Sequence, residues 1–445
     1  MTCGFGRPRC WCASTPGTCE SRAHGGGDRY APAMTSTRVG PSRRGLWPTL
    51  LAGVAAVSLL ASACSSEEPA AAEDKVVTIG VIAPLENGLT SYGRGIANSV
   101  LLAAAEANAR DAIPGYTIEV QALDDSSDPA VGRAAAERIA TNPTVVGVVG
   151  TYNSGVAAEV MPVLDAAGIT MISPANTDPT LSRGPDPVRF AERVWPTYFR
   201  MVATDAEQGP LLASYAYDDL AARSIAVVTE PKPVSAGLAD DFSGAVTQEG
   251  ATVSSLTTLP DDPAAYDLPG VAATVAAAKP DLVFFGGEYD VASQFKTALA
   301  AAGYTGPMMG GDGMKDDAYI TAAGSFADGD IASTVGVPNS SLDAPEYFAA
   351  YTNAAYVDPP TDYGPYAFDA ANLLIETAKI ALEGQDGVNA TVRAKVRDEV
   401  AAAQFGGITG QVAFNEFGDS TNKVFTVFRV TDGAWKPSVT RQVYE

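Results

Sequence analysis

The run Val76-Val-Thr-Ile-Gly-Val-Ile-Ala83, which ends at Pro84, decides the fold of this chain. Its residues are almost all apolar and mostly β-branched, with no alternation of apolar and polar positions. That pattern is typical of a strand buried on both faces, as the strands of parallel sheets are. A polar loop follows, and apolar residues then recur at helical spacing over residues 91–109. We therefore predict a strand and a crossover helix as the first unit of an α/β fold.

The alternation of strand and helix continues along the chain. Predicted strands are residues 116–123, 145–150, 169–172, 224–229, 252–259, 282–286, 307–310 and 412–414, and a closing hairpin of 423–430 and 435–439. Predicted helices are 129–141, capped by Asp128, then 154–167, capped by Ser154, and 235–249, 270–278, 363–382 and 390–403. The pattern restarts after Gln208-Gly-Pro210, where we expect Pro210 to open a helix, and 307–310 is the last strand expected in this second α/β unit. Two units of similar size predict a ligand cleft between them, at the carboxyl ends of the strands.

The first part of the chain has the features of a leader. Arg43 and Arg44 precede an apolar stretch, residues 46–63, which ends in small residues before Cys64, as in an exported precursor. Leu60-Ala-Ser-Ala-Cys64 resembles a bacterial lipobox, although Ala61 stands where Leu is usual. We assign residues 34–63 to a signal peptide that is removed, Cys64 to lipid attachment and residues 64–75 to the lipidated Cys and a flexible tether. The alternative is an uncleaved anchor, and the export route stays open because residues 42–46 partly resemble a twin-arginine signal.

Residues 1–33 differ from the leader and show no apolar periodicity. A misassigned start codon explains them best, since Met34 begins an ordinary signal peptide. The alternative is a small zinc site on Cys3, Cys10, Cys12 and Cys19, but their spacings match no usual ligand pattern. We therefore expect no metal or cofactor.

Composition limits the chemistry of the exported part. After the leader the chain has no His and only Cys64, which excludes Ser-His-Asp triads, Cys-His pairs and disulfides. The leader carries 7 of the 29 Lys and Arg and 2 of the 52 Asp and Glu, which leaves 22 and 50 and a net charge of −28. Such a chain repels phosphate backbones, so we expect no nucleic-acid binding. The missing His and Cys chemistry leads us to expect that the chain is not an enzyme.

Several loops at predicted strand ends carry polar residues. Ser154 lies at a helix start, where a hydroxyl and free N–H groups favour a carboxylate, although a plain N-cap is the simpler interpretation. Asp312 lies in Gly310-Gly-Asp-Gly313, where an aspartate is most often a turn former. The cluster Asp124, Asp125 and Asp128 could pass for a metal site or a catalytic pair, but a strand end and a helix cap explain it more simply.

Six segments together resemble the Leu/Ile/Val-binding proteins, the solute-binding lipoproteins of branched-chain amino acid ABC transporters. They are Ile79-Gly-Val-Ile-Ala-Pro-Leu85, Ser91-Tyr-Gly93, Leu123-Asp-Asp-Ser-Ser-Asp-Pro129, Met171-Ile-Ser-Pro-Ala-Asn-Thr-Asp-Pro179, Gln208-Gly-Pro210 and Phe284-Phe-Gly-Gly287. The resemblance implies a type I periplasmic-binding-protein fold, with two doubly wound parallel-sheet lobes joined by a multi-strand hinge and a ligand cleft between them. It implies an N-terminal lobe of residues 76–198 and 334–420 and a C-terminal lobe of residues 199–333 and 421–445.

The resemblance also implies the site. Ser154 and Thr177 would hold the carboxylate of an amino acid, Thr177 and the carbonyl of Ala175 would meet its ammonium, and Asp312 would replace the usual glutamate as counter-ion. Tyr92 and Tyr366 match positions that wall the ligand's side chain. Val234 and Glu288 depart from the family, which often has tyrosines there. Glu288 either meets a polar or cationic group of the ligand or points to solvent.

The function implied is that of a receptor that closes on an amino acid, branched-chain or related, and presents it to the permease of an ABC importer. We expect a monomer attached to the outer face of the cytoplasmic membrane, or in a periplasm, through lipid on Cys64. Three alternatives remain: a receptor for an aliphatic amide, urea or polar amino acid, a ligand sensor, and a hydrolase that uses carboxylates.

Overall fold

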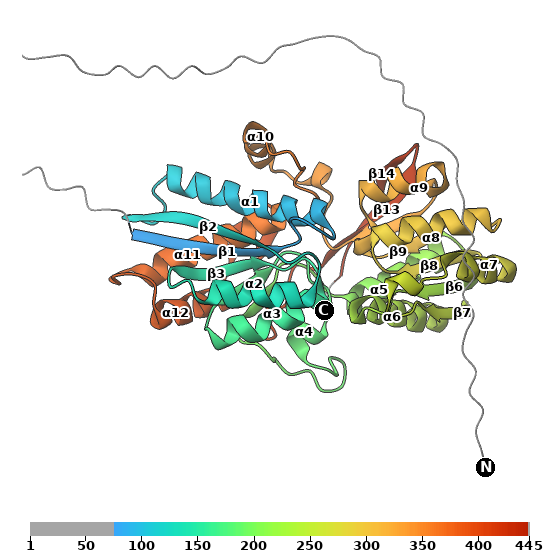
Figure 1. Cartoon of the computed structure of the whole chain (residues 1–445), viewed down its shortest axis with the longest axis horizontal. Coiled ribbons are helices and arrows are strands. Elements are labelled where there is room, and N and C mark those ends of the chain that lie inside the picture. The colour runs from blue at the N-terminus through green and yellow to red at the C-terminus, as the bar shows by residue number, and fades with distance from the viewer. Residues whose placement is uncertain (1–74, 444–445) are drawn as a thin grey trace, which may run out of the picture. The chain divides into compact units, whose positions relative to one another are not determined.

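The computed structural model describes residues 75–443, whose two large sheets, one parallel and one mixed, have helices on both faces (Figure 1). The predicted leader, Cys64 and nearly all of the tether lie outside the described residues. The first sheet has the order β2-β1-β3-β4-β5 and is parallel throughout. Its strands are β1 (Lys75–Ala83), β2 (Tyr116–Asp124), β3 (Val145–Gly150), β4 (Thr170–Ser173) and β5 (Tyr198–Arg200). From Val77 to Ala83, β1 is buried, which confirms the predicted interior strand.

Two groups of helices cover the first sheet. They are α1 (Thr90–Ala109), α10 (Pro345–Asn353), α11 (Gly364–Leu382) and α12 (Ala390–Ala401) in one group, and α2 (Pro129–Ala140), α3 (Ser154–Ala166) and α4 (Thr180–Arg183) in the other. Side chains of α1, α11 and α12 share a core with Val77, Ile79 and Val81 of β1, while α2 and α3 pack on the opposite face, with Ile82. We call this sheet with its helices and the short pair β11 (Phe405–Gly407) and β12 (Gly410–Val412) the N-terminal lobe.

The second sheet has the order β14-β13-β10-β9-β8-β6-β7. Its strands are β6 (Ser224–Thr229), β7 (Thr252–Thr258), β8 (Leu282–Gly286), β9 (Met308–Gly310), β10 (Ile331–Thr334), β13 (Val424–Thr431) and β14 (Ala434–Gln442). The helices are α5 (Asp205–Ser214), α6 (Pro233–Glu249), α7 (Leu268–Ala278), α8 (Tyr289–Ala301) and α9 (Asp317–Ala323). Side chains of α5 and α6 pack on one face and those of α7, α8 and α9 on the other. We call this part the C-terminal lobe.

Short helical segments complete the chain. A π-helical turn, η1 (Tyr215–Asp219), continues α5, and 3-10 turns are η2 (Pro263–Ala265), η3 (Asp312–Met314), η4 (Gly324–Ala327) and η5 (Asn339–Ser341). Within residues 75–443, none of the helices has both the length and the apolar character that a membrane span requires.

The chain passes between the two sheets three times. It leaves the first sheet after β5, returns after β10 to form α10, and enters the second sheet again at β13. In that second sheet β13 and β14 are antiparallel additions beyond β10. The prediction that residues 307–310 form the last strand of the second α/β unit is wrong, because β10 follows α9 and η4 and pairs in parallel with β9.

The position of Pro210 also differs from the prediction. Helix α5 begins at Asp205, and Pro210 lies inside it. The Thr204 N–H donates to Glu207 Oε2 at 3.0 Å, which satisfies the free N–H group before the first turn. This capping interaction starts the helix upstream of the proline, and a proline is then tolerated within a short helix whose packing supports it.

Candidate ligand-binding site

A cavity of about 60 Å³ lies where loops of the two lobes meet. The N-terminal lobe contributes Tyr152, Asn153, Ser154, Ala175 and Thr177, and the C-terminal lobe contributes Asp205, Val234, Ser235, Leu238, Gly287, Glu288, Gly311, Asp312 and Gly313. These residues follow the carboxyl ends of parallel strands or begin the helices after them, where α/β sheets bind ligands. Five of the predicted site residues therefore come together: Ser154, Ala175, Thr177, Glu288 and Asp312.

Ser154 connects two loops of the N-terminal lobe. It is the first residue of α3, and Asn153 occupies the N-cap position, so the expectation that Ser154 is the cap is wrong by one residue. Its hydroxyl oxygen accepts hydrogen bonds from the backbone N–H groups of Thr177 (3.3 Å) and Asp178 (3.4 Å). The N-terminus of α3 gives this side of the cavity a positive potential, and the Ser154 hydroxyl, whose oxygen accepts these two bonds, keeps its hydrogen to donate, which suits a carboxylate.

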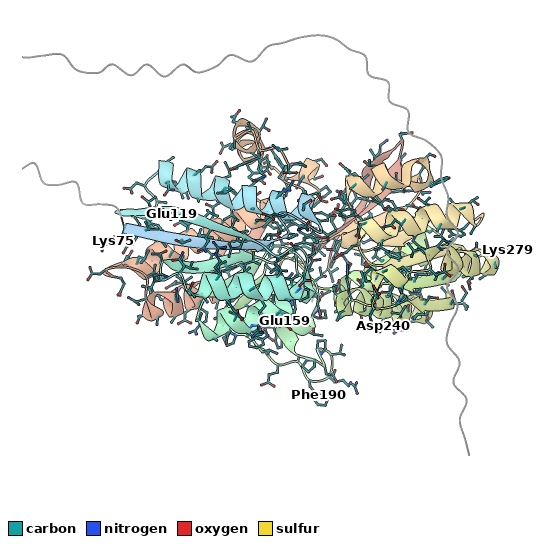
Figure 2. All side chains as sticks on the ribbon, in the orientation of Figure 1. Lys75, Glu119, Glu159, Phe190, Asp240 and Lys279 are labelled. Carbon is teal, nitrogen blue, oxygen red and sulfur yellow. The ribbon has the colours of Figure 1, made fainter. Side chains whose placement is uncertain are left out.

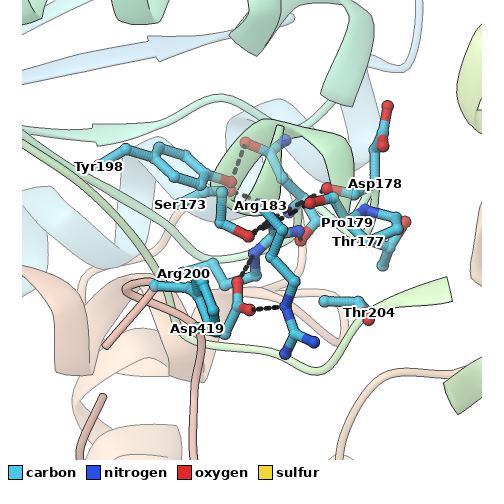
Figure 3. A network of polar contacts seen from close by, with 12 residues as sticks. Ser173, Thr177, Asp178, Pro179, Arg183, Tyr198, Arg200, Thr204 and Asp419 are labelled. Atoms are coloured by element: carbon cyan, nitrogen blue, oxygen red, sulfur yellow. Dashed lines mark hydrogen bonds and ion pairs between the residues drawn. The ribbon is translucent and has the colours of Figure 1, made fainter. Parts of the chain in front are cut away.

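An ion-pair network holds the loop that carries Ala175 and Thr177 (Figure 3). Arg200 is fully buried, and its guanidinium donates to the carbonyl oxygens of Asn176 and Asp178, both at 2.9 Å. Asp419 forms ion pairs with Arg200 and Arg183, each at 2.8 Å. Burial raises the pKa of Asp419, but the two guanidinium groups lower it more, so the carboxylate stays ionised. Sequence inspection missed this network because its members are far apart in the chain.

Asp312 provides the negative side of the cavity. Its Oδ1 accepts a hydrogen bond from Gln208 Nε2 at 3.1 Å, and its Oδ2 accepts one from the Tyr363 hydroxyl at 2.5 Å. Burial raises the pKa of Asp312, whereas these two donors lower it and leave the net shift upward. A cation in the cavity would stabilise the ionised form.

Glu288 has its partners within the chain. Lys232 Nζ lies 2.5 Å from Glu288 Oε2, and Asn153 Nδ2 of the opposite lobe donates to Glu288 Oε1 at 2.6 Å. The backbone N–H of Glu288 donates to Glu230 Oε2 at 2.8 Å, and Lys232 Nζ also approaches Glu230, at 3.2 Å. The side chain of Glu288 is only 13% exposed, so it does not point to solvent. Neither of the two expectations for Glu288 included a lysine of the same lobe as its counter-ion.

One tyrosine, Tyr152, lines the cavity, and it is neither of the two that the resemblance implies. Tyr152 lines the cavity and stacks on Tyr92 with ring centroids 4.5 Å apart, so Tyr92 supports the wall from behind. Tyr363 meets the Tyr152 ring edge to face at 5.3 Å. Tyr366 does not line the cavity, and its hydroxyl accepts a hydrogen bond from the Val337 N–H at 3.2 Å. Tyr363, which immediately precedes α11, does not line the cavity either, but its hydroxyl donates to Asp312, which does.

Asp205 is a further acidic residue that lines the cavity. It is 1% exposed, and neither of its carboxylate oxygens has a hydrogen-bond partner of ordinary geometry. Burial and the nearby charge of Asp312 raise its pKa well above the ordinary value, while the Thr177 hydroxyl lowers it. An acidic residue in the first turn of a helix is common, since it stabilises the helix dipole. Because this common role explains an aspartate at that position, the sequence offered no reason to predict Asp205 as a site residue.

The carboxylates after β2 are structural, as predicted. Asp124 Oδ1 accepts hydrogen bonds from the N–H groups of Leu85 (2.7 Å) and Glu86 (3.0 Å), and Asp128 caps α2. In the part of the chain that the structure describes, no group of three or more Asp, Glu, His or Cys side chains is placed to hold a metal ion.

Comparisons with known proteins agree with this geometry. The sequence pattern of the periplasmic binding protein family matches residues 76–434. The Leu/Ile/Val-binding protein BraC3 of Rhizobium johnstonii is 26% identical over 354 residues, which are 79% of this chain and 91% of that protein. A branched-chain amino acid transporter substrate-binding protein from Streptococcus pneumoniae, LivJ, solved with isoleucine, is 22% identical with a TM-score of 0.71 over 83% of this chain and 99% of its own. A solute-binding protein from R. palustris, solved with benzoate, is 20% identical with a TM-score of 0.69 over 83% and 98%. The match extends over nearly all of both lobes, and the chain therefore belongs to the periplasmic binding protein family.

Proposed function

We propose that this chain is the extracytoplasmic solute-binding component of an ABC importer, and that it binds an amino acid between its lobes. One observation carries the proposal: a single cavity has hydrogen-bond donors on one lobe and a carboxylate on the other. The donors are the start of α3 with Ser154 and Thr177, and the carboxylate is Asp312. A zwitterion needs both charges paired when it leaves water, because an uncompensated buried charge costs several kcal/mol.

The two charges of the ligand would contact different lobes. The carboxylate would accept hydrogen bonds beside Ser154 and Thr177, and the ammonium would meet Asp312 and the carbonyl of Ala175. Binding then favours the arrangement in which the lobes approach each other, since charge-assisted hydrogen bonds form on both sides only there. The names of the relatives support an aliphatic or related amino acid as the ligand.

The delivery partner in this proposal is an ABC permease. Attachment through lipid on Cys64 would keep the protein, as a monomer, at the outer face of the cytoplasmic membrane or in a periplasm. Family membership supports the extracytoplasmic position, and the anchor rests on the leader and lipobox pattern alone. The assignment of residues 76–198 and 334–420 to one lobe, and of 199–333 and 421–445 to the other, is part of the same proposal.

Asp312→Asn tests the proposal. The variant keeps the shape of the side chain and removes the counter-ion of the ammonium, so amino-acid affinity should fall by about 2–4 kcal/mol, roughly 30- to 1000-fold. Isothermal titration of the purified protein, freed of bound ligand, with leucine, isoleucine, valine, alanine, lysine, acetamide and urea measures this change. Asp261→Asn, which removes an exposed carboxylate outside the cavity, is the control and should bind as the parent does.

Two results would contradict the proposal. Unchanged amino-acid affinity in Asp312→Asn would remove Asp312 from the site. Binding of acetamide or urea, with no amino acid bound, would mean that the cavity does not recognise a zwitterion.

A further inference from the structure

A second, larger cavity adjoins the small one. Its volume is about 550 Å³, and Asp205 and Val234 line both cavities. The partition between them therefore consists, at least in part, of these two residues. The larger cavity lies between the loop after β4 and the start of α6, and it is acidic: Asp178, Asp240 and Asp241 line it. Asp240 lies at the outer surface of α6 (Figure 2).

The small cavity is large enough for the head group of an amino acid and little more. A water molecule needs about 10–15 Å³ on this scale, so about 60 Å³ corresponds to roughly four to six water-sized positions. The ammonium, the α-carbon and the carboxylate of an amino acid already comprise five non-hydrogen atoms. The side chain of a longer ligand must extend elsewhere, and the cavity beyond Asp205 and Val234 has the necessary volume.

Asp205 makes the connection chemically specific. Both of its carboxylate oxygens are buried without a hydrogen-bond partner of ordinary geometry, at the partition of the two cavities. A buried carboxylate in that state is costly unless a cation or a strong donor reaches it. The charges of Asp178 and Asp241 act on Asp205 from the side of the larger cavity, and that of Asp312 acts from the side of the smaller one.

The larger cavity has little positive charge to balance these groups. Arg183 is the basic residue that lines it, and its guanidinium is already paired with Asp419 at 2.8 Å. Burial, and then the charges of Asp240, Glu207 and Asp178, raise the pKa of Asp241 to about 6. The electrostatic field of this cavity favours a cation. It disfavours an aliphatic side chain, which would displace water from the carboxylates without replacing its hydrogen bonds.

We propose that the two cavities form one site, and that the ligand is an amino acid with a cationic side chain. Its ammonium and carboxylate occupy the small cavity, and its side chain passes Val234 so that the cationic end lies near Asp205 and Asp241. This inference rests on the proposed function, because it assumes that Ser154, Thr177 and Asp312 hold the head group.

Titration calorimetry with lysine, arginine, ornithine, leucine, alanine and cadaverine tests this inference. Lysine, ornithine or arginine should bind at least tenfold more tightly than leucine, and cadaverine, which lacks the carboxylate, should bind more weakly than lysine. Val234→Phe should weaken the cationic ligands at least tenfold, because the ring narrows the partition between the two cavities.

Asp241→Asn gives an independent measurement, since this half-buried residue lines the larger cavity and not the smaller one. The substitution leaves Asp205 and Val234, which separate the two cavities, unchanged. It should lower lysine, ornithine and arginine affinity threefold or more and leave leucine and alanine unchanged, whereas Asp261→Asn should change nothing. Leucine binding as tight as lysine binding, with the Asp312→Asn effect intact, would overturn the inference and leave the proposed function standing. Absence of binding by all the amino acids would overturn both.

Discussion

Buried carboxylates of this chain differ in how many hydrogen-bond donors face them. Asp330 is surrounded by donors: Lys296 Nζ at 2.6 Å, the Tyr319 hydroxyl at 2.5 Å and the Met308 N–H at 2.7 Å. Asp125 is also fully buried, but only its Oδ1 accepts a hydrogen bond, from the Ser127 N–H at 2.9 Å. Both residues lie outside the cavities, so their environments concern stability alone.

The pH dependence of stability should reveal Asp125. Burial raises its pKa to about 7, so the folded protein binds this proton in a range where the unfolded chain has released it. The stabilisation is therefore fully present below about pH 4 and is lost as the pH rises through about 7. Asp125→Asn has no carboxyl group to titrate at this position, so its stability lacks this pH dependence. The free energy of unfolding of the variant, relative to that of the parent, should therefore increase by about 2 kcal/mol between pH 5 and pH 8.

Urea unfolding of parent and variant at both pH values measures that difference. Asp124→Asn is the control of opposite sign, because hydrogen bonds from Ser126, Leu85 and Glu86 outweigh burial and lower the pKa of Asp124. It should destabilise the protein at neutral pH. A difference that is the same for Asp125→Asn at pH 5 and pH 8 would contradict the raised pKa of Asp125.

At the scale of elements, an ion pair joins two of the segments that connect the sheets. Glu207 lies in the first turn of α5, just after the chain has left the first sheet, and Lys423 immediately precedes β13. Lys423 Nζ lies 2.9 Å from Glu207 Oε1, with side-chain exposures of 6% and 15%. The other oxygen of Glu207 accepts a hydrogen bond from the Thr204 N–H. One carboxylate therefore caps the start of α5 and also pairs with the segment that enters β13.

Lys423→Met should therefore destabilise the protein by more than an exposed ion pair would. It leaves the largely buried Glu207 carboxylate without its cation, and we expect a loss of about 2–4 kcal/mol in the free energy of unfolding. The double variant Lys423→Met with Glu207→Gln should recover part of that loss, because no unpaired charge remains. Chemical denaturation of the two single variants and the double variant gives the coupling energy, and strictly additive losses would contradict an energetic link between the two segments.

For the whole molecule, several contacts around the cavity bridge the two lobes. The Ser91 hydroxyl donates to Asp316 Oδ2 at 2.6 Å, and Lys315 Nζ lies 2.6 Å from Asp362 Oδ2. Asn153 bridges to Glu288 at 2.6 Å. These contacts form only when the lobes are close, so each adds to ligand affinity by favouring that arrangement.

Asn153→Ala should therefore weaken all bound amino acids by the same factor, about 2- to 10-fold, as expected for one hydrogen bond of about 0.5–1.5 kcal/mol. The side chain of Asn153 makes no capping hydrogen bond to α3, so the helix loses no cap in this variant. Asn153→Asp places a carboxylate against Glu288 and should weaken binding further. Affinities for several amino acids measured on both variants decide the matter, and a change in their order of affinity would show that Asn153 contacts the ligand.

Local patterns in the sequence determined the elements and the fold class. Runs of β-branched residues predicted β1 and β3, and the Asp128-Pro129 pair predicted the start of α2, because these signals act within one strand or one helix turn. Spacing along the chain together with the family resemblance predicted which strand-end loops carry the cavity. Ser154, Ala175, Thr177, Glu288 and Asp312, which were predicted, are among the residues that line it.

Only the tertiary structure decided which side chains face one another in that cavity. The pairing of Glu288 with Lys232, the hydrogen bond from Tyr363 to Asp312, and the burial of both Asp205 oxygens without a hydrogen-bond partner of ordinary geometry depend on how the loops meet. Helix and strand signals arise from neighbours a few residues apart, whereas the partner and the solvent exposure of a polar group are set by segments that may be hundreds of residues away. For that physical reason the sequence by itself predicted which loops form the site, and the packing of the lobes determined which charged side chains in it are paired.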